Sequence, residues 1–255
     1  MKIIGIVPAR MAASRFPGKP LYPIFGRPMV EHVFCRASMF SKWDGLYLAT
    51  CDSEIFDFGQ SKGWPTLMTS DRHTRALDRV AEAAGKCGQS LGEDDIVVCV
   101  QGDEPMLYPD MISASILPLD QDPKVPCTVL AMEIVEERQF YDPNTLKIIY
   151  DKKGDVLYTS RSAVPYCKQF PPKHLVPRRI YGIFAFRWHF MKAFTSMPES
   201  PLELVESCDS NRILDNAYRQ RIAPYEFRPS FSVDSPADIE MVEMRMRDDL
   251  LWGRY

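Results

Sequence analysis

Short apolar runs alternate with helix-length amphipathic segments through the first half of the chain. Residues 3–9 (IIGIVPA) form a continuous apolar run of the kind found in strands that are buried on both faces. Similar runs lie at 45–51, 66–70 and 95–105, and segments with helical spacing separate them at 28–40, 54–63, 77–88 and 109–119. This β-α-β-α-β-α-β order predicts an α/β fold with a mostly parallel, doubly wound sheet.

The pattern changes after residue 125. Runs at 127–135 and 146–160 are typical of strands, and Lys152-Lys153-Gly154-Asp155 would fold the second run into a hairpin. Residues 180–187 alternate as a strand does, whereas the Pro-rich, basic stretch at 170–179 is predicted to be an exposed loop.

These segments predict one domain. We expect it to cover residues 1–255, with an antiparallel part inserted at about 125–225. Near its end, SPADIEMVEMRMRDDLLW is predicted to be a helix that is capped by Asp234 or Ser235.

Composition limits the partners. Lys and Arg together number 31 against 34 Asp and Glu, so the net charge of −3 offers no general attraction for nucleic acid or an anionic membrane. No run approaches the ~18 apolar residues of a membrane span, and the first apolar run is too short for a signal peptide. The seven cysteines are scattered without a CxxC pair, which favours reduced thiols in a cytoplasmic protein. Any anion binding must therefore come from local clusters.

Three cations follow the first predicted strand. In PARMAASRFPGKP at 8–20, Arg10, Arg15 and Lys19 lie in a loop where Pro17-Gly18 allows a tight turn. Because ligands bind at the carboxyl ends of the strands in an open parallel sheet, this loop is a candidate polyphosphate cradle. It is neither a Walker P-loop nor a GxGxxG turn. The alternative is a solvated loop whose arginines pair with surface acids.

Two aspartates follow separate predicted strands. Asp103, in VVCVQGDEP at 97–105, suits a hard cation such as Mg²⁺, although it would equally cap a helix before Pro105. Asp234, in FSVDSPADIE at 231–240, offers a second carboxylate, although Asp-Ser-Pro is also a good helix start. Two such carboxylates beside a basic loop form the kind of constellation that nucleotidyl transfer uses.

Together these stretches resemble the 3-deoxy-manno-octulosonate cytidylyltransferase (CMP-Kdo synthetase) family. PARMAASRFPGKPL is similar to its N-terminal signature, VQGDEPML to its central metal-binding motif and VDSPADIEMV to its C-terminal motif. Further similar segments lie at 68–73, 142–166, 181–187 and 200–207. The resemblance therefore covers almost the whole chain.

The resemblance implies a Rossmann-like fold of the nucleotide-diphospho-sugar transferase type and a Mg²⁺-dependent reaction. The family transfers CMP from CTP to the anomeric hydroxyl of an acidic 2-keto sugar and releases pyrophosphate, for lipopolysaccharide or capsule synthesis. The catalytic residues would be Lys19, Asp103 and Asp234, with the two aspartates as Mg²⁺ ligands. The residues expected to contact the nucleotide are Ala9, Arg10, Lys19, His73, Arg79 and Gln101.

The resemblance also implies an acceptor site and a homodimer. The part at about 125–225 is similar to the family's dimerisation region. The residues expected to contact the acid sugar are Arg15, Arg161, Tyr181, Glu206 and Asp209.

Three segments depart from the family pattern. HTRALDR at 73–79 replaces a small Ser-Gly-Thr beside the nucleotide with Arg75-Ala76-Leu77. RIYGIF at 179–184 replaces a His with Ile180 and a Tyr with Phe184, and DSNR at 209–212 replaces Glu-Gln-Leu-Arg. Since a pocket that hydrogen-bonds particular hydroxyls discriminates strongly, these changes predict a changed acceptor.

Two other functions remain open from the sequence. One is a related nucleotidyltransferase for a different acidic acceptor, such as a nonulosonic acid or a phosphonate. The other is a catalytically silent nucleotide-binding regulator. Retention of Arg10, Lys19, Asp103 and Asp234 argues against the regulator, which would have no need of both carboxylates.

Overall fold

The computed structural model describes residues 1–12 and 15–255, so Ala13 and Ser14 of the N-terminal motif lie outside the described residues. The described chain divides into two compact units. Unit 1 contains Met1–Ser113 and Pro229–Tyr255, and unit 2 contains Ala114–Arg228. The single domain over 1–255, with a dimerisation part at about 125–225, stays a prediction.

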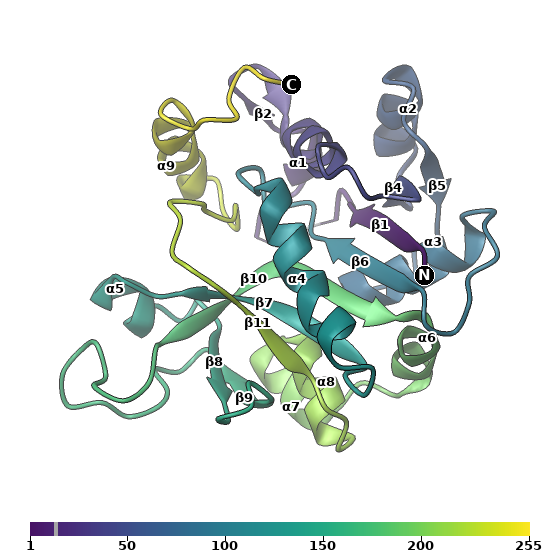
Figure 1. Cartoon of the computed structure of the whole chain (residues 1–255). Coiled ribbons are helices and arrows are strands. Elements are labelled where there is room, and N and C mark those ends of the chain that lie inside the picture. Colours follow the sequence, from purple (N-terminus) through teal and green to yellow (C-terminus); the bar gives the residue numbers. More distant parts are fainter. Residues whose placement is uncertain (13–14) are drawn as a thin grey trace. The chain divides into compact units, whose positions relative to one another are not determined.

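A parallel sheet organises unit 1 (Figure 1). Strand β1 (Ile3–Pro8) lies between β4 (Gly45–Thr50) and β6 (Ile96–Val100), and β5 (Thr66–Met68) pairs with the far edge of β4. The five residues of β6 are all buried, as are most of those in β1, which matches the continuous apolar runs that predicted them. The predicted α/β fold with a mostly parallel sheet is therefore confirmed.

The helices of unit 1 pack on this sheet through apolar faces. Helices α1 (Met29–Ser38) and α3 (Ala76–Lys86) contact β1 and β4, and α2 (Ser53–Ser61) contacts β4 and β5. In α3 the buried positions Leu77, Val80, Ala81 and Ala84 follow the spacing of one helix face. Helix α4 covers Pro109–Gln121. The short elements η1 (Lys19–Leu21), β2 (Pro23–Ile24) and β3 (Arg27–Pro28) lack a periodic signal and were not predicted.

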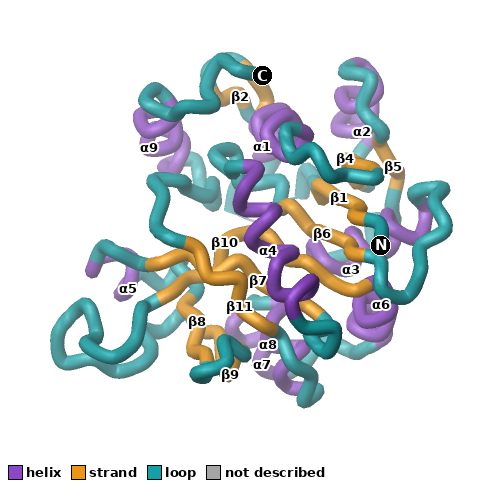
Figure 2. Tube along the Cα trace, viewed as in Figure 1, coloured by secondary structure: helices purple, strands orange, loops and turns teal. Residues whose placement is uncertain are grey.

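Unit 2 contains the predicted antiparallel strands. Strand β7 (Cys127–Glu133) pairs antiparallel with β10 (Arg178–Arg187) and parallel with β11 (Arg221–Tyr225). Strands β8 (Lys147–Tyr150) and β9 (Val156–Ser160) form the predicted hairpin. Figure 2 shows these strands as orange tube. The prediction of a loop over 170–179 is wrong at its end, because Arg178 and Arg179 already pair with β7 and β8.

Four short helices of unit 2 were not predicted. They are α5 (Glu137–Tyr141), α6 (Trp188–Ser196), α7 (Pro201–Glu206) and α8 (Asp209–Asp215). Helix α7 starts with a capping box, in which Ser200 and Glu203 bond to each other's backbone amides. A segment of one or two turns is too short to establish a hydrophobic period, so sequence periodicity does not reveal it.

The C-terminal helix α9 (Ala237–Met246) begins later and ends earlier than expected. Pro236 occupies the cap position, and neither Asp234 nor Ser235 caps the helix with its side chain. The Asp238 carboxylate instead accepts hydrogen bonds from the amides of Asp234 and Ser235, at 2.9 and 2.7 Å.

Within residues 1–12 and 15–255, no helix combines the length and apolar character that a membrane crossing requires.

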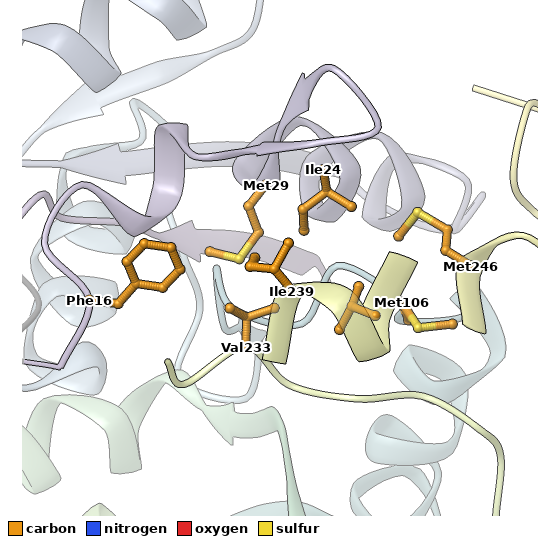
Figure 3. Close-up of a cluster of buried hydrophobic side chains, with 8 residues drawn as sticks. Phe16, Ile24, Met29, Met106, Val233, Ile239 and Met246 are labelled. Atoms are coloured by element: carbon orange, nitrogen blue, oxygen red, sulfur yellow. The ribbon is translucent and has the colours of Figure 1, made fainter. Parts of the chain in front are cut away.

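An apolar cluster joins α9 to the N-terminal loop (Figure 3). The Phe16 ring and the Met29 and Ile239 side chains point toward one another, with Val233 beside them. Phe16 lies in the basic loop, and Val233 directly precedes Asp234. The cluster therefore holds two distant candidate-site segments against one core.

Candidate active site

The basic loop after β1 closes on itself through its glycine. Gly18 has φ +75°, which glycine adopts without strain, and its amide donates to the Met11 carbonyl at 2.9 Å. The Met11 amide in turn donates to Asp52 Oδ2 at 2.8 Å. The predicted tight turn at Pro17-Gly18 is therefore confirmed, and it directs Lys19 into the first turn of η1.

Lys19 connects the two predicted metal-binding segments. Its Nζ donates to Asp103 Oδ2 at 2.9 Å and to the Val233 carbonyl at 2.7 Å. The Val233 amide also donates to the Asp103 carbonyl at 2.9 Å, so the two strand ends are joined directly. The structure thus brings Lys19 and Asp103 into contact and ties both to the residue before Asp234.

Asp103 retains an unused acceptor in this cluster. Its Oδ1 is buried and has no hydrogen-bond partner in the described part of the chain. The preceding Gly102 allows the loop to approach β1, because a Cβ there would lie 2.6 Å from the Pro8 carbonyl oxygen. The lack of a side chain at Gly102 therefore serves contact with the backbone of β1. Asp103 does not cap a helix, since the elements that flank it are β6 and α4.

Asp234 pairs with the basic loop. Its Oδ1 accepts from Arg15 Nη2 at 2.8 Å, and half of the Arg15 side chain is exposed. Burial raises the pKa of Asp234, and the negative charge of Asp103 raises it further, while Arg15 and Lys19 act in the opposite direction. An arginine of this loop does pair with an acid, as the alternative interpretation expected, but that acid is the second candidate metal ligand.

The carboxylates suit a magnesium ion that is shared with a substrate. Among residues 1–12 and 15–255, no group of three or more His, Cys, Asp and Glu side chains is arranged to hold a metal. Mg²⁺ is commonly bound through one or two carboxylates, with substrate phosphates and water completing its ligands. The buried, unpartnered Oδ1 of Asp103 fits that mode of binding, and so does the raised pKa of Asp234, whose ionised form a cation would favour.

A second basic group lies beside the loop before α3. Arg10 Nη1 and Arg79 Nη2 both contact the His73 carbonyl at 3.4 Å, and Arg79 is almost fully buried. The His73 imidazole hydrogen-bonds through Nε2 to Glu82. The structure therefore brings together three of the predicted nucleotide-binding residues, Arg10, His73 and Arg79.

The remaining nucleotide-side residues lie at neighbouring strand ends. Ala9 directly follows β1, and its amide donates to the Ala49 carbonyl at 2.9 Å. Gln101 directly follows β6, and its carbonyl accepts from the Glu104 amide at 3.3 Å. Because β1 and β6 are parallel neighbours, both residues lie at the same edge of the sheet as Arg10 and Asp103.

In unit 2, Arg161 and Glu206 form one hydrogen-bonded group. Glu206 Oε1 accepts from Tyr158 at 3.0 Å and from Ser160 at 2.7 Å, while Oε2 accepts from the Arg161 amide at 2.8 Å. Arg161 donates in turn to the carbonyls of Glu206 and Pro143, at 2.9 and 3.0 Å. Burial alone would raise the pKa of Glu206, but these hydrogen bonds lower it. The carboxylate is therefore held ionised by its own chain.

The other two predicted acceptor residues have different surroundings. Tyr181 is fully buried, and the Arg179 guanidinium lies 5.4 Å from its ring centre. Asp209 is half-buried in the first turn of α8.

Lys147 is a buried cation that sequence reasoning missed. Its Nζ donates to the carbonyls of Asp142, Thr145 and Arg161 at 2.8, 2.5 and 2.6 Å. Burial, with a smaller effect from Arg161, lowers the pKa of Lys147 to about 8. It is the second residue after Thr145 in an ordinary strand pattern, and nothing in that pattern signals its burial. It braces the backbone that carries Arg161.

Glu82 and Asp238 were also missed, although each contacts a predicted site segment. Glu82 lies one turn beyond Arg79 in α3, and Asp238 lies four residues beyond Asp234. Both are acidic residues on helices, a class that is usually solvated, so only the fold reveals their partners.

A parallel sheet with cations and paired carboxylates at the carboxyl edge of its strands is an arrangement suited to nucleotidyltransferases. A family model described as cytidylyltransferase matches residues 4–227. The chain is 35% identical to a 3-deoxy-manno-octulosonate cytidylyltransferase of Syntrophotalea carbinolica, over 97% of this chain and 99% of the relative. It is 37% identical to an 8-amino-3,8-dideoxy-manno-octulosonate cytidylyltransferase of Shewanella frigidimarina, over 98% of this chain and all of the relative.

A solved structure of CMP:2-keto-3-deoxy-manno-octonic acid synthetase complexed with CTP is also similar. It matches with a TM-score of 0.86 and 31% identity, covering 98% of this chain and all of that one. The chain belongs to the 3-deoxy-manno-octulosonate cytidylyltransferase family of cytidylyltransferases. The resemblance that the sequence motifs suggested is confirmed.

Proposed function

We propose that the protein transfers CMP from CTP to the anomeric hydroxyl of a 3-deoxy-2-keto acid sugar of the Kdo type and releases pyrophosphate. The observation that carries this proposal is the contact of Lys19 with Asp103 and with the residue before Asp234, at the carboxyl edge of a parallel sheet. Membership of the cytidylyltransferase family supports the nucleotide, and the names of the relatives support the acceptor.

In this reaction the anomeric oxygen attacks the α-phosphorus of CTP. A new oxygen–phosphorus bond forms while the bond to the β-phosphate oxygen breaks, and the hydroxyl proton leaves to solvent. Lys19 and Arg10 would neutralise the charge that the triphosphate carries and that the pyrophosphate develops. Gln101 and Ala9 would position the nucleoside at the ends of β6 and β1. Positioning and electrostatics supply most of the rate enhancement in such transfers.

Asp103 and Asp234 would hold a Mg²⁺ ion with the triphosphate. Support comes from the buried, unpartnered Oδ1 of Asp103 and from the raised pKa of Asp234, since a cation would satisfy the first and favour ionisation of the second. When bound, the ion would stabilise negative charge on the phosphate oxygens. Lys19 contacts Oδ2 of Asp103, and the unpartnered Oδ1 would be available to such an ion.

The acceptor residues would be Arg15, Arg161, Tyr181, Glu206 and Asp209. An arginine is the natural partner for the carboxylate of an acid sugar. Glu206 would act mainly by positioning Arg161, because its own oxygens already accept three hydrogen bonds.

A second candidate acceptor is the 8-amino form of the sugar. The relative named for that sugar is 37% identical to this chain, and Ile180 and Phe184 depart from the polar residues that are typical of Kdo enzymes. An acceptor with different polar groups would suit such a change. Nonulosonic acids and phosphonates are further acidic acceptors to compare.

We further propose a homodimer in the cytoplasm that serves lipopolysaccharide or capsule synthesis. Leu157, Leu202, Leu204 and Val205 of unit 2 expose apolar side chains, which supports an interface there. All seven cysteines are free thiols, which supports a reducing compartment. Light scattering after size exclusion should give twice the 29.2 kDa mass of the chain.

Pyrophosphate release with CTP, Mg²⁺ and a panel of acid sugars tests the activity. The panel should contain Kdo, its 8-amino form, a nonulosonic acid and a phosphonate. We expect release with Kdo or its 8-amino form and much less with the others. Tight CTP binding without release from any acceptor would indicate a silent regulator instead, and UTP turnover equal to CTP turnover would contradict a cytidylyltransferase.

A further inference from the structure

The loop that leads into α3 is fastened by one carboxylate that the proposed reaction does not use. Glu82 accepts from the Ser70 amide through both oxygens, at 3.2 and 3.0 Å, and from Nε2 of His73 through Oε2. On its other side it pairs with Lys86, whose side chain is half exposed. Glu82 therefore grips the beginning of the loop and its histidine at once.

Glu82 is ionised at neutral pH. Burial alone would raise the pKa of Glu82, but hydrogen bonds from Lys86, the Ser70 amide and His73 together lower it to about 2. An ionised carboxylate only accepts hydrogen bonds, so the Nε2 atom of His73 carries a proton. The imidazole is thereby fixed in one orientation, with Nδ1 on the side away from Glu82.

The backbone of this loop contacts two arginines, Arg10 and Arg79. The His73 carbonyl is contacted by Arg10 Nη1 and by Arg79 Nη2, both at 3.4 Å. Arg79 also donates to Thr69 and to the Ser70 carbonyl, so its position depends on the same loop. A shift of the His73 backbone would therefore move the place where the Arg10 guanidinium is held.

We propose that Glu82 is a positioning residue for nucleotide binding, which acts through His73 and, by way of the His73 carbonyl, through Arg10. It does not touch the nucleotide itself. This inference rests on the proposed function, because it takes Arg10 and His73 to be the residues that contact CTP. Glu82 then governs the binding of CTP and leaves the acid sugar and the chemical step largely unaffected.

The test compares Glu82→Gln with the matched control Lys86→Met in the full chain. Glutamine keeps an oxygen for the Ser70 amide but loses the charge that holds His73. We expect the dissociation constant and KM for CTP to rise about tenfold, as for loss of one charge-assisted hydrogen bond, with KM for the acid sugar and kcat changed less than about twofold. Lys86→Met removes the solvent-side ion pair and a 3.4 Å contact with the Met68 carbonyl, but it keeps the Glu82 charge and the bonds of Glu82 to Ser70 and His73. KM for CTP should therefore stay within about twofold of wild type.

Wild-type CTP affinity in Glu82→Gln, or an equal loss of affinity in Lys86→Met, would overturn the inference. A wild-type chain that does not bind CTP would instead overturn the proposed function, and this inference with it.

A second measurement does not depend on how the variant folds. The ¹⁵N chemical shifts of the wild-type His73 ring should show a proton on Nε2. A ring protonated on Nδ1 alone would overturn the inference even if Glu82→Gln is unstable.

Discussion

The ion pairs of the candidate active site and the buried Arg212–Glu203 pair of unit 2 use the same side-chain chemistry in opposite ways. Arg212 and Glu203 are 2% and 0% exposed and bond through two contacts, at 2.8 and 2.7 Å. Lys19 and Asp103 are 13% and 27% exposed, and Arg15 and Asp234 are 51% and 32% exposed. One pair is closed to solvent, and the others remain within reach of a ligand.

The difference lies in what each carboxylate still has to offer. Both Glu203 oxygens accept from Arg212, and Oε2 also accepts from the Ser200 amide. Asp103 uses Oδ2 for Lys19, while its Oδ1 is buried without a partner in the described chain. A satisfied buried pair stabilises a fold, whereas a half-satisfied, partly exposed pair is suited to bind an ion and an anion. On this basis we expect the Arg212–Glu203 pair to serve stability and the Lys19–Asp103 pair to serve binding.

The largest effect should come from breaking the buried pair. Glu203→Ala leaves the Arg212 charge without its carboxylate and should lower the free energy of unfolding by about 3–5 kcal/mol. Urea denaturation measures this loss, and the turnover of the folded fraction should stay near wild type. A loss similar to that of an exposed pair would contradict the comparison.

Lys19→Met should affect activity more than stability. Removing a cation that faces developing phosphate charge should lower kcat/KM by about 10²–10³. Lys62→Met is the matched control, because Lys62 also pairs with an acid, Glu31, but lies outside the site. Steady-state pyrophosphate release would give the ratio. Equal activity losses in the two variants would place Lys19 among the structural pairs.

The pH dependence of stability should show how much the ionised Glu82 carboxylate contributes to the fold. Its folded pKa of about 2 lies below the ordinary value of 4.5, so its stabilisation is present above pH 4.5 and is lost as the pH falls toward 2. The free energy of unfolding of the wild type should exceed that of Glu82→Gln by about 1–3 kcal/mol at pH 6–7, and this difference should narrow at acid pH. Denaturation of both proteins at pH 6.5 and pH 3.5 measures it. A gap that widens in acid would contradict the sign.

The smallest stability effect should come from Arg15→Ala. Half of this side chain is exposed, so loss of its pair with Asp234 should change the free energy of unfolding by less than about 1 kcal/mol. If Arg15 serves the acceptor, KM for the acid sugar should rise several-fold. An unchanged KM for the sugar and a raised KM for CTP would assign Arg15 to the nucleotide instead.

The sequence predicted the parts of the molecule that depend on local pattern. Buried strands such as β1 and β6 are continuous apolar runs. Arg10 and Lys19 lie in the segment after β1, and Asp103 lies in the loop after β6. The edge of a parallel sheet then brings these residues together. Lys19 and Asp103 were therefore within reach of prediction before any coordinates.

The rest depends on contacts between distant segments. The Asp103 loop and the Val233 backbone join over more than a hundred residues, and Glu82 reaches back to Ser70 and His73 across the start of a helix. Burial of Lys147 and the short helix α7 are set by packing in unit 2 and leave no periodic signal. Such features follow from the completed fold.

Lys19, Asp103 and Asp234 are proposed to form a metal and triphosphate site. Calorimetric titration of CTP into the wild type and Asp103→Asn, each with and without Mg²⁺, tests this site. We expect Mg²⁺ to strengthen CTP binding by at least about tenfold in the wild type and to have almost no effect in the folded variant. An equal effect of Mg²⁺ on the two proteins would contradict the claim.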